Sequence, residues 1–155
     1  MKFTLDTSLA TDLDADCLVI GVLEDAPLHG SAELVDQACT GALQQLIDSG
    51  DVGTDWKDTT LLHGLEGVAA KRILVLGCGE TEKFDSVRFD NVCAVAGRFL
   101  RDHTTTSAHI CLHEIEVAQT TEDWRLRQTA VNLARANYRY TTTKAPKDDD
   151  NQPLT

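Results

Sequence analysis

The sequence lacks an apolar run long enough to cross a membrane. Its longest uninterrupted apolar stretches, such as Cys17 to Leu23, fall well short of the roughly 20 residues that a spanning helix needs. It also lacks a basic start followed by an apolar signal core, because an acid follows almost at once, at Asp6. These absences lead us to expect a cytoplasmic protein.

Closely spaced cysteine pairs are also missing. The sequence has five cysteines, an odd number, and no Cys-x-x-Cys pair. A disulfide framework or a zinc ribbon would group its cysteines more tightly. We therefore interpret them as small buried hydrophobic residues in a reducing compartment. They are Cys17, Cys39, Cys78, Cys93 and Cys111.

Positive charge is scarce. The 155 residues include 25 Asp plus Glu against 14 Lys plus Arg, which gives a formal net charge of -11. A surface with that balance repels phosphate backbones, so nucleic acid is an unlikely partner of this chain. The length and the 42% hydrophobic content suit one soluble domain with a single sizeable core.

Strand-like and helix-like segments alternate along the chain. The predicted strands are Lys2 to Leu5, Cys17 to Leu23, Thr59 to His63, Arg72 to Leu76 and Ala108 to Leu112. This order predicts an α/β three-layer sandwich, with helices on both faces of one sheet. The short links between the first two strands and between the next two indicate a mixed sheet of five or more strands. Val19, Val75 and Ile110 are expected deep in its core.

Three helices are predicted between these strands. Apolar pairs recurring every four residues indicate one helix that Ser31 caps and Gly50 ends. A second helix follows the cap residue Asp85, where the spacing of Phe84 and Phe89 suits a hydrophobic staple. A third helix starts near Thr121.

The composition changes after Tyr140. Residues 141–155 have no hydrophobic periodicity and read as the start of an interdomain linker, after a domain of residues 1–140. We expect this tail to be poorly ordered and the natural protein to continue beyond Thr155.

A glycine turn, Gly77-Cys78-Gly79, lies between a predicted strand and a predicted helix. Nucleotide-binding folds hold phosphate at this position. The full Gly-x-Gly-x-x-Gly pattern fails because Glu82 stands where the last glycine belongs, and no Gly-Lys-Ser/Thr is present. The sequence favours a tight turn at the end of a strand over a phosphate site.

Three potential metal ligands alternate in His109-x-Cys111-x-His113. Alternation would place them on one face of a strand, where zinc or copper could use them. Neighbouring ligands on a straight strand lie about 7 Å apart, too far to hold one ion without ligands from elsewhere. A structural role is the favoured interpretation.

Cys78 is the candidate nucleophile, because it lies in the glycine turn. It has no histidine nearby in sequence, although His29, His63 or His103 could approach it in space. A buried structural cysteine is the favoured interpretation.

Acidic runs and a basic helix are the remaining charged patterns. Asp12-x-Asp14-x-Asp16 and Asp148 to Asp150 could attract calcium, but they lack the glycine and the distal glutamate of an EF-hand loop. Solvated loop acids are the favoured interpretation. The arginines of the third helix predict a salt-bridged face toward other parts of a larger molecule. They are Arg125, Arg127, Arg135 and Arg139.

Four segments in this order carry a family resemblance: Asp16 to Val22, Thr60 to His63, Arg72 to Gly79 and Trp124 to Gln128. The set resembles the amino-terminal domain of the cytosolic leucyl aminopeptidases, the PepA-type family of two-metal exopeptidases. The stretch from Arg72 to Gly79 is the most specific. Asn137 to Tyr140, followed by Lys144, looks like the family's approach to its interdomain linker. The resemblance covers roughly Met1 to Lys144.

The resemblance implies a macro-domain-like fold and an accessory role. Members of the family are homohexamers that remove amino-terminal residues, leucine prominently, from peptides. Their two divalent ions, usually zinc, manganese or magnesium, are held by residues of a carboxy-terminal catalytic domain. This chain ends before that domain, so we expect none of its residues to be catalytic, to bind a cofactor or to bind a metal.

Two hypotheses about function remain open at this point. The first is an accessory domain of an aminopeptidase, which packs against the catalytic half and within the hexamer. The second is a macro-like module whose loops after Leu23 and Leu76 hold a nucleotide or ADP-ribose. The incomplete phosphate-binding glycine pattern favours the first. Fold likeness alone does not transfer a ligand.

Overall fold

The computed structural model describes residues 2–103 and 105–137. Within them, four strands form one mixed sheet in the order β2-β3-β1-β4. The strands are β1 (Cys17–Val22), β2 (Thr59–His63), β3 (Arg72–Gly77) and β4 (Ala108–Ile110). β1 is parallel to both β3 and β4, whereas β2 is antiparallel to β3. The predicted mixed sheet is confirmed, but the prediction of five or more strands is wrong.

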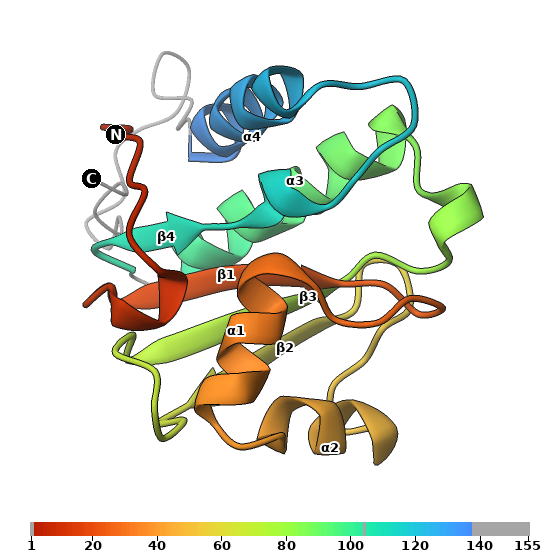
Figure 1. Cartoon of the computed structure of the whole chain (residues 1–155). Helices are drawn as coiled ribbons and strands as arrows, with labels where there is room; N and C mark the ends of the chain where they lie inside the picture. Colours follow the sequence, from red (N-terminus) through yellow and green to blue (C-terminus); the bar gives the residue numbers. More distant parts are fainter. Residues whose placement is uncertain (1, 104, 138–155) are drawn as a thin grey trace.

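Helices cover both faces of the sheet. They are α1 (Gly30–Ala38), α2 (Ala42–Asp48), α3 (Ser86–Asp102) and α4 (Glu122–Asn137), with short 3-10 turns η1 (Ala10–Asp12), η2 (Thr81–Lys83) and η3 (Leu112–Glu114). Figure 1 shows α3 and α4 on one side of the sheet and α1 and α2 on the other. The predicted α/β sandwich is therefore confirmed. No helix in the described part of the chain is both long enough and apolar enough to span a membrane.

Side chains of the central strands β1 and β3 pack into two hydrophobic clusters, one on each face of the sheet. Leu18 and Ile20 of β1 belong to the cluster beneath α1 and α2, whereas Val19 belongs to the cluster beneath α3 and α4. Side chains alternate along a strand, so a strand covered on both faces needs apolar residues at every position. Val19 and Val75 are fully buried, as predicted. Ile110 is only half-buried because it lies on the edge strand β4.

The second predicted helix has the expected start. The side chain of Asp85 accepts a hydrogen bond from the Arg88 N–H at 2.9 Å, which caps α3. The Phe84 and Phe89 rings pack edge to face at 6.3 Å, so the predicted hydrophobic staple is present. Phe89, Val92 and Leu100 lie on its buried face.

The single helix predicted from Ser31 to Gly50 is two helices. Thr40 and Gly41 have positive φ angles of 59° and 82°, which end α1 and redirect the chain into α2. The Gly41 N–H donates to the Asp36 carbonyl at 2.8 Å, and the Asp36 carboxylate accepts from the Gln44 N–H at 2.8 Å. Both helices present their apolar stripe to the same cluster, so the sequence periodicity continues across the break.

Beside β4, one predicted strand is absent and another is shorter than predicted. Residues 2–6 pair with no strand, and a cavity of about 490 Å³ separates them from β4 and α4. Phe3 and Leu5 are 47% and 78% exposed, so this segment gains little burial that would fix a register. The strand predicted from Ala108 to Leu112 ends at Ile110, where η3 begins two residues later.

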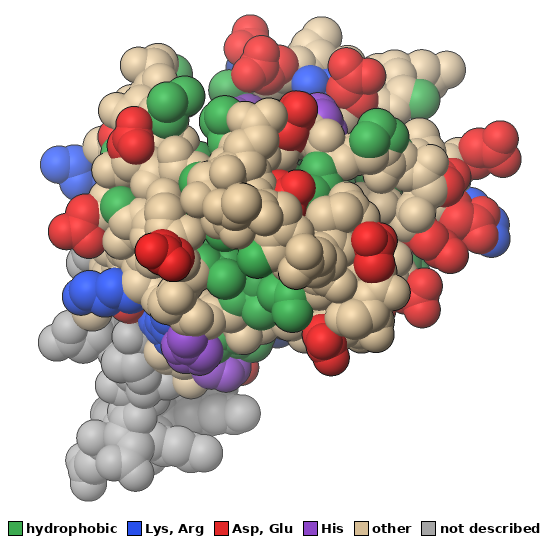
Figure 2. Space-filling view, turned by 60° about the horizontal axis from the view of Figure 1, so that its bottom comes forward, with side chains coloured by type: hydrophobic (Ala, Val, Ile, Leu, Met, Phe, Trp, Pro, Cys, Tyr) green, Lys and Arg blue, Asp and Glu red, His purple; other side chains and the backbone are tan. Residues whose placement is uncertain are grey.

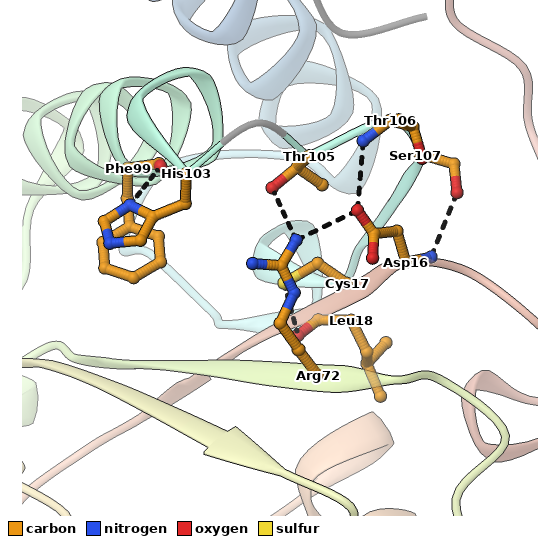
Figure 3. Close-up of polar contacts among 9 residues, drawn as sticks. All are labelled: Asp16, Cys17, Leu18, Arg72, Phe99, His103, Thr105, Thr106 and Ser107. Carbon is orange, nitrogen blue, oxygen red and sulfur yellow. Dashed lines mark hydrogen bonds and ion pairs between the residues drawn. The ribbon is translucent and has the colours of Figure 1, made fainter.

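A polar network joins the amino ends of the parallel strands (Figure 3). The Asp16 carboxylate accepts hydrogen bonds from Arg72 at 3.0 Å and from the Thr106 N–H at 3.1 Å. Arg72 also donates to the Thr105 hydroxyl at 3.2 Å, and the Asp16 N–H donates to the Ser107 hydroxyl at 3.0 Å. The network fixes the starts of β1, β3 and β4, which leaves the loops at their carboxyl ends as the place for a site.

Three interpretations fall outside the described residues. They are the poorly ordered linker after Tyr140, the acid run from Asp148 to Asp150, and Arg139.

Candidate functional site

The natural place for a ligand in this fold is the crevice at the carboxyl ends of β1 and β3. In open α/β sheets, ligands bind where helices leave to opposite faces. Here α1 follows β1 on one face, while α3 follows β3 on the other. Val22 and Gly77 are paired at the ends of these two strands, so the glycine turn after β3 lies beside the loop that leads to α1.

The backbone of the glycine turn is already hydrogen-bonded to protein. The N–H of Gly77 donates to Asp58 O at 2.8 Å, that of Cys78 to Val22 O at 2.8 Å, and that of Gly79 to Thr54 O at 2.9 Å. A phosphate-binding turn needs such N–H groups free and converging on the ligand. Gly77 ends β3 and the two residues after it donate their N–H groups to protein carbonyls, which favours a structural role for this segment over a phosphate site.

The loop of residues 53–58 covers the turn and explains its glycines. A Cβ on Gly77 would collide with the Asp55 carbonyl oxygen, and a Cβ on Gly79 would lie 3.2 Å from the Trp56 Cβ. The Trp56 ring in turn contacts two cations, since Lys57 Nζ and Arg88 Cζ each lie 4.4 Å from its centroid. Glycine is therefore needed at these two positions because the loop of residues 53–58 packs closely against their backbone.

Cys78 is not arranged as a nucleophile. Its side chain is completely buried, and burial raises the pKa of the thiol to about 12. The His29 ring bonds to Glu114 O and the His103 ring bonds to Phe99 O, while His63 is paired with Arg72 at the other end of β3. A buried thiol that stays protonated is a poor nucleophile, which favours the structural interpretation.

The amino terminus of α1 is occupied by a carboxylate of the protein itself. Glu114 Oε2 accepts from the Ser31 N–H at 2.7 Å, and Glu114 Oε1 accepts from the Ser31 hydroxyl at 2.8 Å. The predicted cap residue Ser31 thus lies inside the helix, and His29 precedes it without a side-chain cap bond. Glu114, which is 83 residues away in sequence, supplies the cap.

A second carboxylate binds the loop after the glycine turn. Asp25 Oδ1 accepts from the Thr81 hydroxyl at 2.6 Å and from the Thr81 N–H at 2.9 Å. These hydrogen bonds lower the pKa of Asp25, because they stabilise its charged form. Asp25 and Glu114 therefore accept hydrogen bonds from backbone N–H groups that an anionic ligand could otherwise use.

Very little space remains in the crevice. Ile115 Cδ1 occupies the place of a Cβ on Gly21, and a cavity of about 10 Å³ is left beside Gly21, Pro27 and His29. One water molecule needs roughly this volume, so a nucleotide does not fit without a rearrangement. The crevice is closed in this conformation.

The three potential metal ligands near β4 do not converge. Cys111 is buried in the cluster beneath α1, where burial raises its pKa to about 12, while His109 and His113 line the cavity beside residues 2–6. Burial also lowers the pKa of His109. No group of three or more His, Cys, Asp or Glu side chains within residues 2–103 and 105–137 could hold a metal ion. A structural role for this motif stays a prediction.

The charged patterns have structural partners. Asp16 takes part in the network with Arg72 rather than in a cation site with Asp12 and Asp14. Arg125 donates to His113 O at 2.8 Å and to the Thr120 hydroxyl at 3.1 Å, which fastens α4 to the preceding loop. None of the three ion pairs found among the described residues involves an arginine of α4. The predicted salt bridges would join these arginines to other parts of a larger molecule, so that face stays a prediction.

The acidic balance is visible on the surface. Figure 2 shows Asp and Glu side chains spread over one face, with Lys and Arg few and scattered. That face offers no basic patch for a nucleic acid, in agreement with the net charge of -11.

Sequence patterns do not predict three residues that hold the segments around the crevice. Glu114, Asp25 and Trp56 act on segments far from them in sequence, with separations of 83 residues for Glu114 to Ser31 and 56 for Asp25 to Thr81. Local patterns carry no signal for such contacts.

Comparison with known proteins identifies relatives over the whole chain. Residues 19–147 match the family model described as "Cytosol aminopeptidase family, N-terminal domain". A probable cytosol aminopeptidase of Xanthomonas axonopodis pv. citri (strain 306) is 36% identical over 155 residues, which are 100% of this chain and 32% of that protein. The chain thus spans about a third of the length of the curated relatives it matches.

Solved structures share the fold at low sequence identity. A mutant of tomato leucine aminopeptidase has a TM-score of 0.68 and 12% identity, with 95% of this chain and 30% of that chain covered. The macrodomain of Mycobacterium tuberculosis DarG has a TM-score of 0.65 and 12% identity, with 85% and 90% covered. These likenesses show a macro-domain-like fold.

Proposed function

Because the chain belongs to the cytosol aminopeptidase family as its N-terminal domain, we propose that it is an accessory domain that takes no chemical part in peptide cleavage. The closed crevice is the observation that carries this proposal. The glycine turn donates its N–H groups to protein carbonyls, and two carboxylates hold the neighbouring donors. A domain whose strand-end crevice is closed, and whose described residues hold no clustered set of metal ligands, is suited to packing against a catalytic half.

The full-length protein, in this proposal, is a cytoplasmic homohexamer that removes amino-terminal residues from peptides. Two divalent ions, zinc, manganese or magnesium, would be held in its carboxy-terminal catalytic domain and would activate water there. The names of the relatives support the aminopeptidase activity, and their greater length leaves room for a catalytic domain. Residues 1–140 would form the accessory domain, and residues 141–155 would begin the linker.

Activity measurements test the accessory role. The purified chain is expected to release no p-nitroaniline from leucine-p-nitroanilide with added manganese or zinc, because no metal cluster is assembled among its described residues. A full-length cytosol aminopeptidase under the same conditions is the positive control. Metal-dependent release that survives repurification of the chain would contradict the proposal.

Ligand binding tests the alternative, a macro-like module for a nucleotide or ADP-ribose. Glu80 directly follows the glycine turn, and Lys83, a cation three residues further along, already pairs with Glu80 at 3.2 Å. A carboxylate close to a diphosphate costs a few kcal/mol at an effective dielectric of about 20. We therefore expect ADP-ribose to bind no more tightly than about 1 mM, as measured by titration calorimetry. Micromolar binding would favour the ligand module.

A further inference from the structure

Glu114 holds the amino terminus of α1 in the way that a bound anion would. Its two carboxylate oxygens accept separately from the N–H and the hydroxyl of Ser31, at 2.7 and 2.8 Å. Hydrogen bonds to an ionised acceptor at a helix amino terminus are strong, because the helix dipole adds to them. The site that the fold offers to an anionic ligand is therefore filled from within the chain.

The segment that carries Glu114 is anchored on both sides. The carbonyl of Glu114 can only accept, so the His29 Nε2–H donates to it at 2.9 Å. Ile115, which is 3% exposed, packs its side chain over Gly21 at the end of β1. A Cβ on Gly30 would lie 2.6 Å from Glu114 Oε2, so the absence of that atom admits the carboxylate. Backbone, carboxylate and apolar contacts together close the crevice between β1 and α1.

We propose that Glu114 and Ile115 form an autoinhibitory contact, an internal block that excludes diphosphate-containing ligands from the crevice. The carboxylate takes the donors at the start of α1 and adds a negative charge, while Ile115 fills the space that a ligand would need beside Gly21. This inference goes beyond the accessory role. The block explains why a macro-like fold is closed: the Glu114 carboxylate holds the donors that a ligand would need, and Ile115 narrows the remaining space.

Pyrophosphate binding tests the block. Glu114→Ala is compared with the unchanged chain by NMR titration with inorganic pyrophosphate, following the amides of Gly30 and Ser31. The variant is expected to bind at least tenfold more tightly, with its largest shifts at these amides. Glu33→Ala is the matched control, since it removes one exposed carboxylate from the same first turn without freeing the Ser31 donors. Glu114→Ala/Ile115→Ala is expected to bind more tightly still.

Each result decides the proposal. Circular dichroism first confirms that each variant is folded, and the single variant decides alone if the double variant does not fold. Equal gains in Glu114→Ala and Glu33→Ala would show a general charge effect and overturn the block. No gain in folded Glu114→Ala would overturn it as well. Because these outcomes concern the variants, they are separate from ADP-ribose binding by the unchanged chain, which tests the accessory role.

Discussion

The burial of single residues can be predicted from a local sequence pattern in the central strands but not in an edge strand. Val19 and Val75 lie in apolar runs of strands that are covered on both faces, so their full burial follows from the sequence alone. Ile110 has the same chemistry, yet it is only half-buried because β4 has a neighbour on one side. Strand order is a property of the assembled sheet and cannot be read from a three-residue segment.

The burial of Val75 can be tested by mutation. Truncation of Val75 to Ala is expected to lower the free energy of unfolding by about 1–3 kcal/mol, because the closely packed neighbours cannot fill the space that is left. Urea denaturation measures the loss. Val87→Ala is the matched control and should change stability by less than about 0.5 kcal/mol, since Val87 is 65% exposed. Equal effects at the two positions would contradict the assigned burial.

Secondary-structure elements were predicted well where local signals agree with the tertiary fold. The cap and staple of α3 lie within a few residues of one another, so Asp85, Phe84 and Phe89 could be recognised in advance. The break between α1 and α2 was missed, because both helices use the same hydrophobic cluster and the apolar period runs through it. The strand predicted at residues 2–5 failed for a different reason, namely that no pairing partner lies beside it.

Gly41 tests the helix break through the sign of a stability change. Gly41 has a φ of 82° and a Cβ there would meet no atom within 4 Å, so Gly41→Ala adds backbone strain without a clash. Unfolding experiments are expected to show a loss of about 1–2 kcal/mol. Gly41→Asn should lose less, because Asn tolerates this conformation better than Ala. A continuous helix through Gly41 would instead gain about 1 kcal/mol from Ala, so a stabilised variant would contradict the break.

The candidate site could not be predicted from the sequence, because it forms only in the whole folded molecule. Its crevice is built from the ends of β1 and β3, the start of α1 and the segment after β4, which come together only when the sheet has formed. The negative conclusions about the glycine turn and Cys78 could be reached from missing motif residues. The positive finding, a crevice closed by Glu114, Ile115 and Asp25, depends on long-range contacts that one sequence does not reveal.

Cooperativity is the property that this architecture predicts for the whole molecule. Successive residues of β1 pack into opposite clusters, as Leu18 and Val19 do. Both helix layers therefore depend on the same sheet, and unfolding of one layer would disrupt the sheet that the other needs. We expect a single two-state unfolding transition in urea. The fluorescence of Trp56 and Trp124 reports on the cluster beneath α3 and α4, and a dye on the half-buried Cys39 reports on the other cluster. The two midpoints should coincide with that of far-UV circular dichroism. A Cys39 transition at lower urea concentration would show that α1 and α2 unfold independently and would contradict the shared-sheet argument.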